Sequence, residues 1–252
     1  MDHLSTIRRY ELDTVLCHFP TPGSRVIEIG GGTGWQARIL SDHGYRVDSV
    51  DIHHPAGETF FPVQLYDGCV LPFPDNCFDV VFSSNVLEHV TDLDRLLREM
   101  IRILKPGGKM IHVLPTTGWR IWTSLAHYPF LLKYVASVGR ATMTTQVRPT
   151  VRGTLQRRGW LGTLRSVLIP PPHGTSRSSL SELSAFSANK WTQTFHNAGL
   201  DVIRYQECGL FYTGHSLFPQ MGIRGRQRVA RVLGSSSALY ELSPRNATPS
   251  AQ

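Results

Sequence analysis

The chain has 252 residues, of which 41% are hydrophobic and 18% are charged. This length is ample for one core domain with an insertion, and the lack of an internal repeat excludes a repeat protein. The formal net charge of +7 is unevenly distributed: residues 1–115 carry 10 Lys and Arg against 15 Asp and Glu, whereas residues 116–252 carry 16 against 4. The basic second half predicts an anionic partner, such as a membrane face, a phosphate-bearing substrate or a nucleic acid.

A buried strand is predicted at 25–29, and a glycine turn follows it directly. This stretch contains Glu28, Gly30, Gly31, Gly32 and Gly34. Glycines let the backbone pass where a side chain would collide with a ligand. The helix predicted over 35–43 points its N-terminal N–H groups at the same place. The turn therefore predicts a nucleotide-like ligand.

A second strand is predicted at 46–51, and Asp51 is its last residue. A carboxylate at that position can accept both hydroxyls of a ribose. A dinucleotide and S-adenosylmethionine both satisfy the glycine turn and this acid, so these two features leave the choice open.

Further strands are predicted at 61–66, 78–84 and 109–114. Asp67 and Gly68 follow the first of them, and Asn85 follows the second. An apolar stripe predicts a helix over 93–104, with Thr91 and Asp92 at its start and Pro106-Gly107-Gly108 as its stop. Alternating strands and helices indicate a mostly parallel sheet with helices on both faces, which binds ligands beyond the C-terminal strand ends.

In its order and spacing, the series over residues 25–115 resembles the class I S-adenosylmethionine-dependent methyltransferases, in particular their small-molecule, type-11 branch. The resemblance implies an α/β, Rossmann-like, seven-stranded and mostly parallel sheet with a C-terminal antiparallel β-hairpin. It also implies S-adenosylmethionine as cofactor. Gly31 departs from the pattern, because many relatives carry a larger residue there, and we expect no effect on binding.

The resemblance also assigns roles to individual residues. The cofactor-binding set is Glu28 with Gly30, Gly31, Gly32 and Gly34 for the methionine part, Asp51 for the ribose, Ile52 and Asp67 with Gly68 for the adenine, and Asn85 beside the reactive methyl. Asn85 has an alternative role as the cap of the next helix.

We expect one domain over residues 1–243. Its parts are a cofactor-binding half at 1–115, a basic insertion that covers the substrate at about 116–186, a closing helix and hairpin at 187–218, and a C-terminal segment at 219–243. Residues 244–252 are expected to form a disordered tail.

The run at 119–138 mixes aromatic and aliphatic residues with Arg and Lys, and Pro129 suits the first turn of a second helix. Such a helix pair is typical of a lid packed on the sheet, or of a contact with a membrane surface or a lipid-like substrate. Nucleic acid is disfavoured, since no RNA-binding module accompanies the run. We expect a cytoplasmic location, with peripheral membrane contact as an addition, because the N-terminus has no apolar signal segment.

Methyl transfer to a hydroxyl needs a base, and histidine suits this role near neutral pH. We predict His173 as the catalytic base and His215 as the second choice. Glu88 and His89 are adjacent and should point in different directions, so structural roles are expected for both. The four cysteines show no metal-ligand spacing, and no metal site is expected.

These features favour an O-methyltransferase that acts on a sugar-containing or lipid-linked small molecule. The strings around His173, Trp191 and 211–214 resemble, weakly, methyltransferases of polysaccharide and lipid-linked glycan biosynthesis. The alternatives are a methyltransferase of a quinone-like or other secondary metabolite, and a non-catalytic nucleotide-binding protein.

Overall fold

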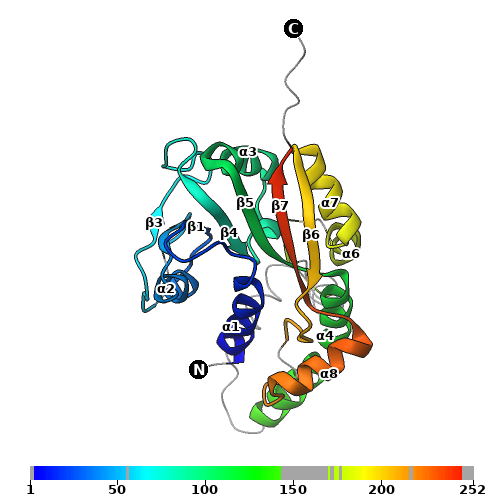
Figure 1. Ribbon diagram of the computed structural model, residues 1–252. Helices are drawn as coiled ribbons and strands as arrows, with labels where there is room; N and C mark the ends of the chain where they lie inside the picture. The colour runs from blue at the N-terminus through cyan, green and yellow to red at the C-terminus, as the bar shows by residue number, and fades with distance from the viewer. Residues whose placement is uncertain are drawn as a thin grey trace.

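The computed structural model describes residues 3–54, 57–142, 170, 173–175, 178–215 and 218–245. One sheet of seven strands, in the order β3-β2-β1-β4-β5-β7-β6, organises them (Figure 1). The strands are β1 (Arg25–Ile29), β2 (Arg46–Asp51), β3 (Gln64–Leu65), β4 (Phe78–Ser84), β5 (Leu104–Pro115), β6 (Leu200–Glu207) and β7 (Ser237–Pro244). Strands β3, β2, β1, β4 and β5 run parallel, and β7 runs antiparallel to both β5 and β6.

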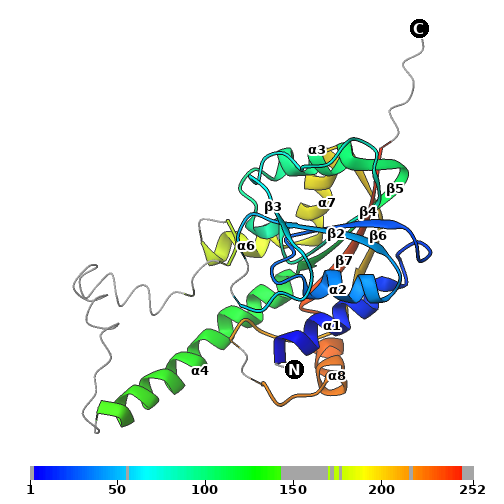
Figure 2. The same ribbon diagram turned by 90° about the vertical axis from the view of Figure 1, so that its left-hand side faces the viewer.

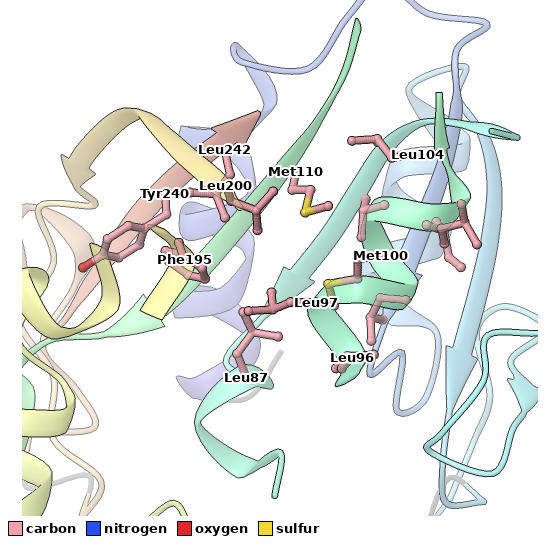
Figure 3. Close-up of a cluster of buried hydrophobic side chains, with 14 of the residues drawn as sticks. Leu87, Leu96, Leu97, Met100, Leu104, Met110, Phe195, Leu200, Tyr240 and Leu242 are labelled. Carbon is pink, nitrogen blue, oxygen red and sulfur yellow. The ribbon is translucent and has the colours of Figure 1, made fainter. Parts of the chain in front are cut away.

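Helices cover both faces of this sheet, as the alternation predicts. Helices α1 (His3–Leu16) and α2 (Trp35–Asp42) cover one face, and α3 (Leu93–Ile103) and α7 (Ala188–Asn197) cover the other. Successive strand residues point to opposite faces, so Val80 packs with α1 and α2 whereas Val81 packs with α3 and α7. Figure 3 shows the cluster on the side of α3 and α7, in which Leu97 and Met100 of α3 belong to the same core as Met110 of β5 and Phe195 of α7.

Helix α3 begins where the sequence predicts. The Asp92 side chain accepts a hydrogen bond from the Arg95 N–H at 3.2 Å and caps the helix. The predicted glycine stop is wrong, because the helix ends at Ile103 and Leu104 is already extended. Residues 105–108 are the irregular part of β5: its register against β4 shifts there, and Gly107 has a φ of 77°.

The closing antiparallel pair differs from the expected hairpin at 187–218. Strand β6 lies where expected, but its partner is β7, and α8 (Ile223–Leu233) lies between them in the chain. The apolar residues at 210–212 leave the sheet because Leu210 and Tyr212 pack with Ile7 and Trp119 in a separate small core. Of the expected tail, Pro244 belongs to β7, and residues 246–252 lie outside the described residues.

The basic insertion begins with one long helix rather than two. Helix α4 (Thr117–Thr142) contains Pro129 in its interior, and Figure 2 shows the helix running away from the sheet. Near the sheet it packs against α6 (Ser179–Ala185). Residues 143–169 of the expected cover lie outside the described residues. Among the described helices, none is both long and apolar enough to cross a membrane.

Candidate functional site

A cavity of about 610 Å³ opens beyond the C-terminal ends of β1, β2 and β4. Six predicted cofactor residues line it, namely Gly30, Asp51, Ile52, Asp67, Gly68 and Asn85. The other four, Glu28, Gly31, Gly32 and Gly34, are not among its lining residues; they belong to the end of β1 and the adjoining turn. The strand ends therefore gather most of the predicted set around one space, as the topology requires.

Two glycines of the turn are required by close packing. Gly30 has a φ of 77°, and a Cβ on it would lie 2.4 Å from Val86 Cγ2. Gly34 precedes α2 with a φ of 75°, and a Cβ there would lie 2.6 Å from the Phe61 carbonyl oxygen. Both positions combine a left-handed backbone with no room for a side chain, which only glycine tolerates.

Asp51 holds the turn against the end of β2. Its Oδ2 accepts a hydrogen bond from the Gly32 N–H at 2.8 Å, and its Oδ1 accepts one from the His53 N–H at 3.1 Å. A carboxylate offers about four acceptor positions. The two that these contacts leave are available to the hydroxyls of a ribose in the cavity.

Glu28 lies behind the turn. Its side chain is buried, and the Ser49 Oγ donates a hydrogen bond to its Oε2 at 2.6 Å. Burial raises the pKa of Glu28 to about 7, which the Ser49 hydrogen bond partly opposes. Gly31 makes room for this pair, since a Cβ there would lie 2.0 Å from Ser49 Oγ. The small residue at 31 and the Ser49–Glu28 bond thus form one local arrangement.

The loop after β3 is held by its first residue. The Asp67 Oδ1 accepts hydrogen bonds from the Val70 and Cys69 N–H groups at 2.9 and 2.8 Å, and these bonds lower the pKa of Asp67. No described group bonds its Oδ2, which is therefore available to a donor such as an exocyclic amine.

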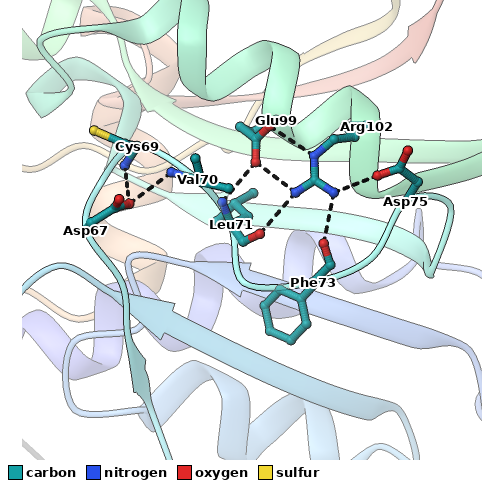
Figure 4. A network of polar contacts seen from close by, with 8 residues as sticks. All are labelled: Asp67, Cys69, Val70, Leu71, Phe73, Asp75, Glu99 and Arg102. Atoms are coloured by element: carbon teal, nitrogen blue, oxygen red, sulfur yellow. Dashed lines mark hydrogen bonds and ion pairs between the residues drawn. The ribbon is translucent and has the colours of Figure 1, made fainter.

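Arg102 of α3 fixes the rest of this loop (Figure 4). Its guanidinium donates to the carbonyl oxygens of Leu71 and Phe73 and to the carboxylates of Glu99 and Asp75, at 2.7 to 3.0 Å. Five donors in a fixed plane suit such multiple recognition. The wall of the cavity that carries Asp67 is thus tied to the core helix.

Asn85 lines the cavity directly after β4. It adopts a left-handed φ of 55°, which asparagine tolerates better than most residues, and its N–H donates to the Val113 carbonyl oxygen at 2.8 Å. The alternative role as a helix cap is wrong, because Val86 occupies the cap of the following 3₁₀ turn, η1 (Leu87–His89).

Glu88 and His89, for which structural roles are expected, lie in the turn that follows β4. His89 lines the cavity, and its ring centroid lies 4.8 Å from that of His173. Burial lowers the pKa of His173 to about 4 and also lowers that of His89, whereas it raises the pKa of Glu88 to about 7. Neither predicted base, His173 nor His215, is among the lining residues. The ring centroid of His215 lies 5.4 Å from that of His127 on α4.

A buried ion pair positions the His173 turn. The Glu182 Oε1 accepts hydrogen bonds from the His173 and Gly174 N–H groups, both at 2.7 Å. The Glu182 Oε2 lies 3.0 Å from Arg120 Nε, and both side chains are almost fully buried. Helices α4 and α6 thereby fix residues 173 and 174 against η1.

Several lining residues were not predicted from the sequence, including Tyr66, Val86, His89, Thr91 and Arg95. Val86 and His89 follow the end of β4, so the strand-end rule could have found them. Arg95 lies in the first turn of α3, where the sequence shows no signal beyond helical periodicity.

Comparison with known proteins identifies the domain. Residues 27–112 match a family model described as a methyltransferase domain, and these residues carry the glycine turn, Asp51, Asp67 and Asn85. Residues 27–112 of the chain form a methyltransferase domain. Over 120 residues, the methyltransferase domain is 37% identical to the ubiquinone/menaquinone biosynthesis C-methyltransferase UbiE of Vibrio campbellii, a match that covers 41% of this chain and 46% of that protein.

A second relative, an uncharacterized methyltransferase of Mycobacterium sp., is 36% identical over 123 residues, or 43% of this chain and 47% of that protein. The chain thus spans about half the length of these curated relatives. In both cases the likeness concerns the methyltransferase domain rather than the whole chain.

Solved structures share the fold of nearly the whole chain. The S-adenosylmethionine-dependent methyltransferase of Mesorhizobium loti matches with a TM-score of 0.53 at 16% identity, covering 92% of this chain and 97% of that one. A chain of the complex between the Haloferax volcanii Trm112 methyltransferase activator and the putative methyltransferase matches with a TM-score of 0.54 at 18% identity, covering 96% and 93%. The predicted fold class of the methyltransferase domain is confirmed.

Proposed function

We propose that this chain transfers a methyl group from S-adenosylmethionine to a small-molecule acceptor. The observation that carries the proposal is the convergence of Gly30, Asp51, Asp67 and Asn85 on one cavity at the C-terminal edge of the sheet. The Asp51 carboxylate has two acceptor positions left for the hydroxyls of a ribose. The second oxygen of Asp67 can accept from the amino group of an adenine. Gly30, which has no side chain, lets a ligand lie close to the backbone.

S-adenosylmethionine supplies an electrophilic methyl group on a sulfonium. In this proposal Asp51 accepts from the ribose hydroxyls, Ile52 lies against the adenine and Asp67 accepts from its amino group. The glycine turn admits the methionine part, with the acidic Glu28 behind it, and Asn85 lies beside the methyl. The chain's contribution is mainly to hold the cofactor and acceptor in line, which can supply much of the rate enhancement.

For the acceptor we propose first a hydroxyl of a sugar-containing or lipid-linked molecule. The support is His89, which lines the cavity, together with His173, whose ring centroid lies 4.8 Å from that of His89. An imidazole at this position can take up a hydroxyl proton. A quinone-like acceptor is the second candidate, and the names of the UbiE relatives favour it. Assays with both acceptor classes, read out by S-adenosylhomocysteine release, would distinguish them.

The Asp51→Ala variant should bind S-adenosylhomocysteine at least about tenfold more weakly than the unmodified protein, because it loses two hydrogen bonds to the ribose. Calorimetric titration of the purified chain measures this. Asp48→Asn is the matched control, since Asp48 lies on the same strand but pairs with Arg25 away from the cavity. Equal affinities of Asp51→Ala and the unmodified protein would remove Asp51 from the site.

We also propose that α4 and α8 contact an anionic membrane surface. In the first half of α4, Ile121, Leu125 and Tyr128 are exposed along one face, whereas Thr123, Ala126 and His127 are buried. On α8, Arg224, Arg228 and Arg231 are exposed at helical spacing. The Trp122 Nε1–H donates to the Leu233 carbonyl oxygen at 2.9 Å and ties the two helices together. An apolar face beside a basic one is what binding at a lipid interface requires.

Leu125→Glu should weaken binding to vesicles of phosphatidylcholine and phosphatidylglycerol by about tenfold, because burial of one leucine contributes roughly 1.5–3 kcal/mol. Co-sedimentation measures the bound fraction. Ile203→Glu on β6 is the control, since Ile203 is equally apolar and exposed but lies in the edge strand. The proposed surface would be contradicted if both variants lost the same share of vesicle binding, or if binding did not depend on the content of phosphatidylglycerol.

A further inference from the structure

Three potential metal ligands meet beside the cavity, and one of them, His89, lines it. A carboxylate oxygen of Glu88 and a ring nitrogen from each of His89 and His173 lie within 4.8 Å of one another. They come from two distant parts of the chain, η1 and the turn at 173–175. The Thr175 N–H donates to the Glu88 carbonyl oxygen at 3.0 Å, so the backbone itself joins these parts.

Glu88 lacks the partners that a buried carboxylate needs. Its side chain is fully buried, and neither carboxylate oxygen accepts a hydrogen bond from the residues that the structure describes. The nearest cationic candidate is His89, whose Nε2 lies 3.8 Å from Glu88 Oε1. An unpartnered buried acid is costly, and a bound cation is one of the few ways to satisfy it.

The neighbouring arginines form their ion pairs with other carboxylates, although the charge of Arg8 partly opposes the rise in the pKa of Glu88. Arg8 Nη1 pairs with the Glu11 Oε2 at 2.8 Å, and Arg120 pairs with Glu182. Each guanidinium therefore has its own carboxylate, and the Glu88 oxygens keep their acceptor positions for a ligand. The positive charges of Arg8 and Arg120 lower the affinity of the site for a cation, but the three ligand atoms of Glu88, His89 and His173 remain in place.

We propose that Glu88, His89 and His173 bind a divalent transition-metal ion next to the cofactor cavity. Two imidazole nitrogens and one carboxylate oxygen suit Zn²⁺ and its first-row neighbours better than Mg²⁺ or Ca²⁺. Three protein ligands leave a coordination position for an acceptor oxygen, as in catalytic zinc sites. Glu182 acts through His173 as a positioning residue, because it holds the backbone of that ligand.

This inference rests on the proposed function and narrows its acceptor to a hydroxyl. A hydroxyl bound to the metal ion loses its proton more readily, and the proton leaves to solvent. The acceptor oxygen then forms the new O–C bond, the C–S bond breaks, and its electron pair stays on sulfur to give S-adenosylhomocysteine. His173 serves here as a metal ligand, which replaces the free base expected from the sequence.

The test is calorimetric titration of the full chain with ZnCl₂ after treatment with EDTA. We expect one strong site, and a loss of at least about tenfold in affinity in Glu88→Gln and in His89→Asn. His89→Asn is included because the His89 side chain is half-exposed, so its replacement should leave the protein folded even if Glu88→Gln does not fold. His196→Asn is the matched control: His196 lies 3.7 Å from Asp201 at an exposed site, and its loss should leave the strong site unchanged.

Titration with S-adenosylhomocysteine separates this inference from the proposed function. If that ligand binds but Zn²⁺ affinity is equal in the unmodified protein and both variants, the metal site is refuted and the methyltransferase proposal stands. If Zn²⁺ binds through Glu88 and His89 but S-adenosylhomocysteine does not bind, the metal site is supported and the proposed function is refuted.

Discussion

Glu182→Ala should lower the free energy of unfolding by about 3–5 kcal/mol, the range typical of a buried ion pair that loses one partner. The variant leaves the Arg120 guanidinium buried without its carboxylate and removes the acceptor of the His173 and Gly174 N–H groups. Urea denaturation followed by circular dichroism measures the change.

Two further variants separate the loss of the hydrogen-bond acceptor from the loss of the ion pair. Glu182→Gln retains an acceptor for the two N–H groups and should lose less stability than Glu182→Ala. Arg120→Met combined with Glu182→Leu removes both charges and should recover part of the loss, since apolar replacement of a whole buried pair is often neutral. A loss below about 1 kcal/mol in Glu182→Ala would mean that water reaches this pair.

Glu28→Gln should stabilise the protein by about 3 kcal/mol at pH 8 and leave its stability unchanged near pH 4. Burial raises the pKa of Glu28 to about 7 in the folded chain, above the ordinary value of 4.5. An acid whose pKa is raised favours folding while it is protonated. Its contribution is complete below about pH 4.5 and disappears as the pH rises through 7.

The measurement is the difference in unfolding free energy between the variant and the unmodified chain across that pH range, which cancels the other titrating groups. Glutamine keeps an oxygen that can accept from Ser49 Oγ, so the 2.6 Å hydrogen bond has a counterpart in the variant. A difference that does not change between pH 4 and pH 8 would show that Glu28 is ionised without penalty in the folded protein.

The cofactor side of the site could be predicted from the sequence because its determinants are local. Gly30 and Asp51 directly follow or end their strands, and parallel strands bring those ends together whatever the rest of the chain does. The fold class follows from the same alternation. Gly31 is the exception, since its role depends on Ser49 of the neighbouring strand, which the local sequence does not reveal.

The acceptor side could not be predicted because it depends on contacts between distant segments. His89 meets His173 only because Glu182 and Arg120 hold the later turn over η1. Adjacent residues were expected to diverge, which is true of a regular helix but not of the short turn that carries Glu88 and His89.

The closing strand was missed for a related reason. Residues 237–244 are buried on both faces of the sheet, so Leu239 packs with α1 and α2 whereas Tyr240 and Leu242 pack with α7. Such a strand lacks the simple alternation of a half-exposed one. The apolar residues at 210–212 were the stronger signal, but Leu210 and Tyr212 pack in the small core with Trp119 instead.

The position of β7 has a consequence for how the chain matures during synthesis. It is the last strand of the described chain to leave the ribosome, yet it lies between β5 and β6 and supplies hydrogen bonds to both. Until residues 237–244 emerge, β5 is an open edge and β6 has no place in the sheet, and such edges are templates for aggregation. The nascent protein therefore carries the open edge of β5 while residues 116–236 are made, β6 joins it as a second unpaired strand after residue 207, and the late insertion of β7 closes both together.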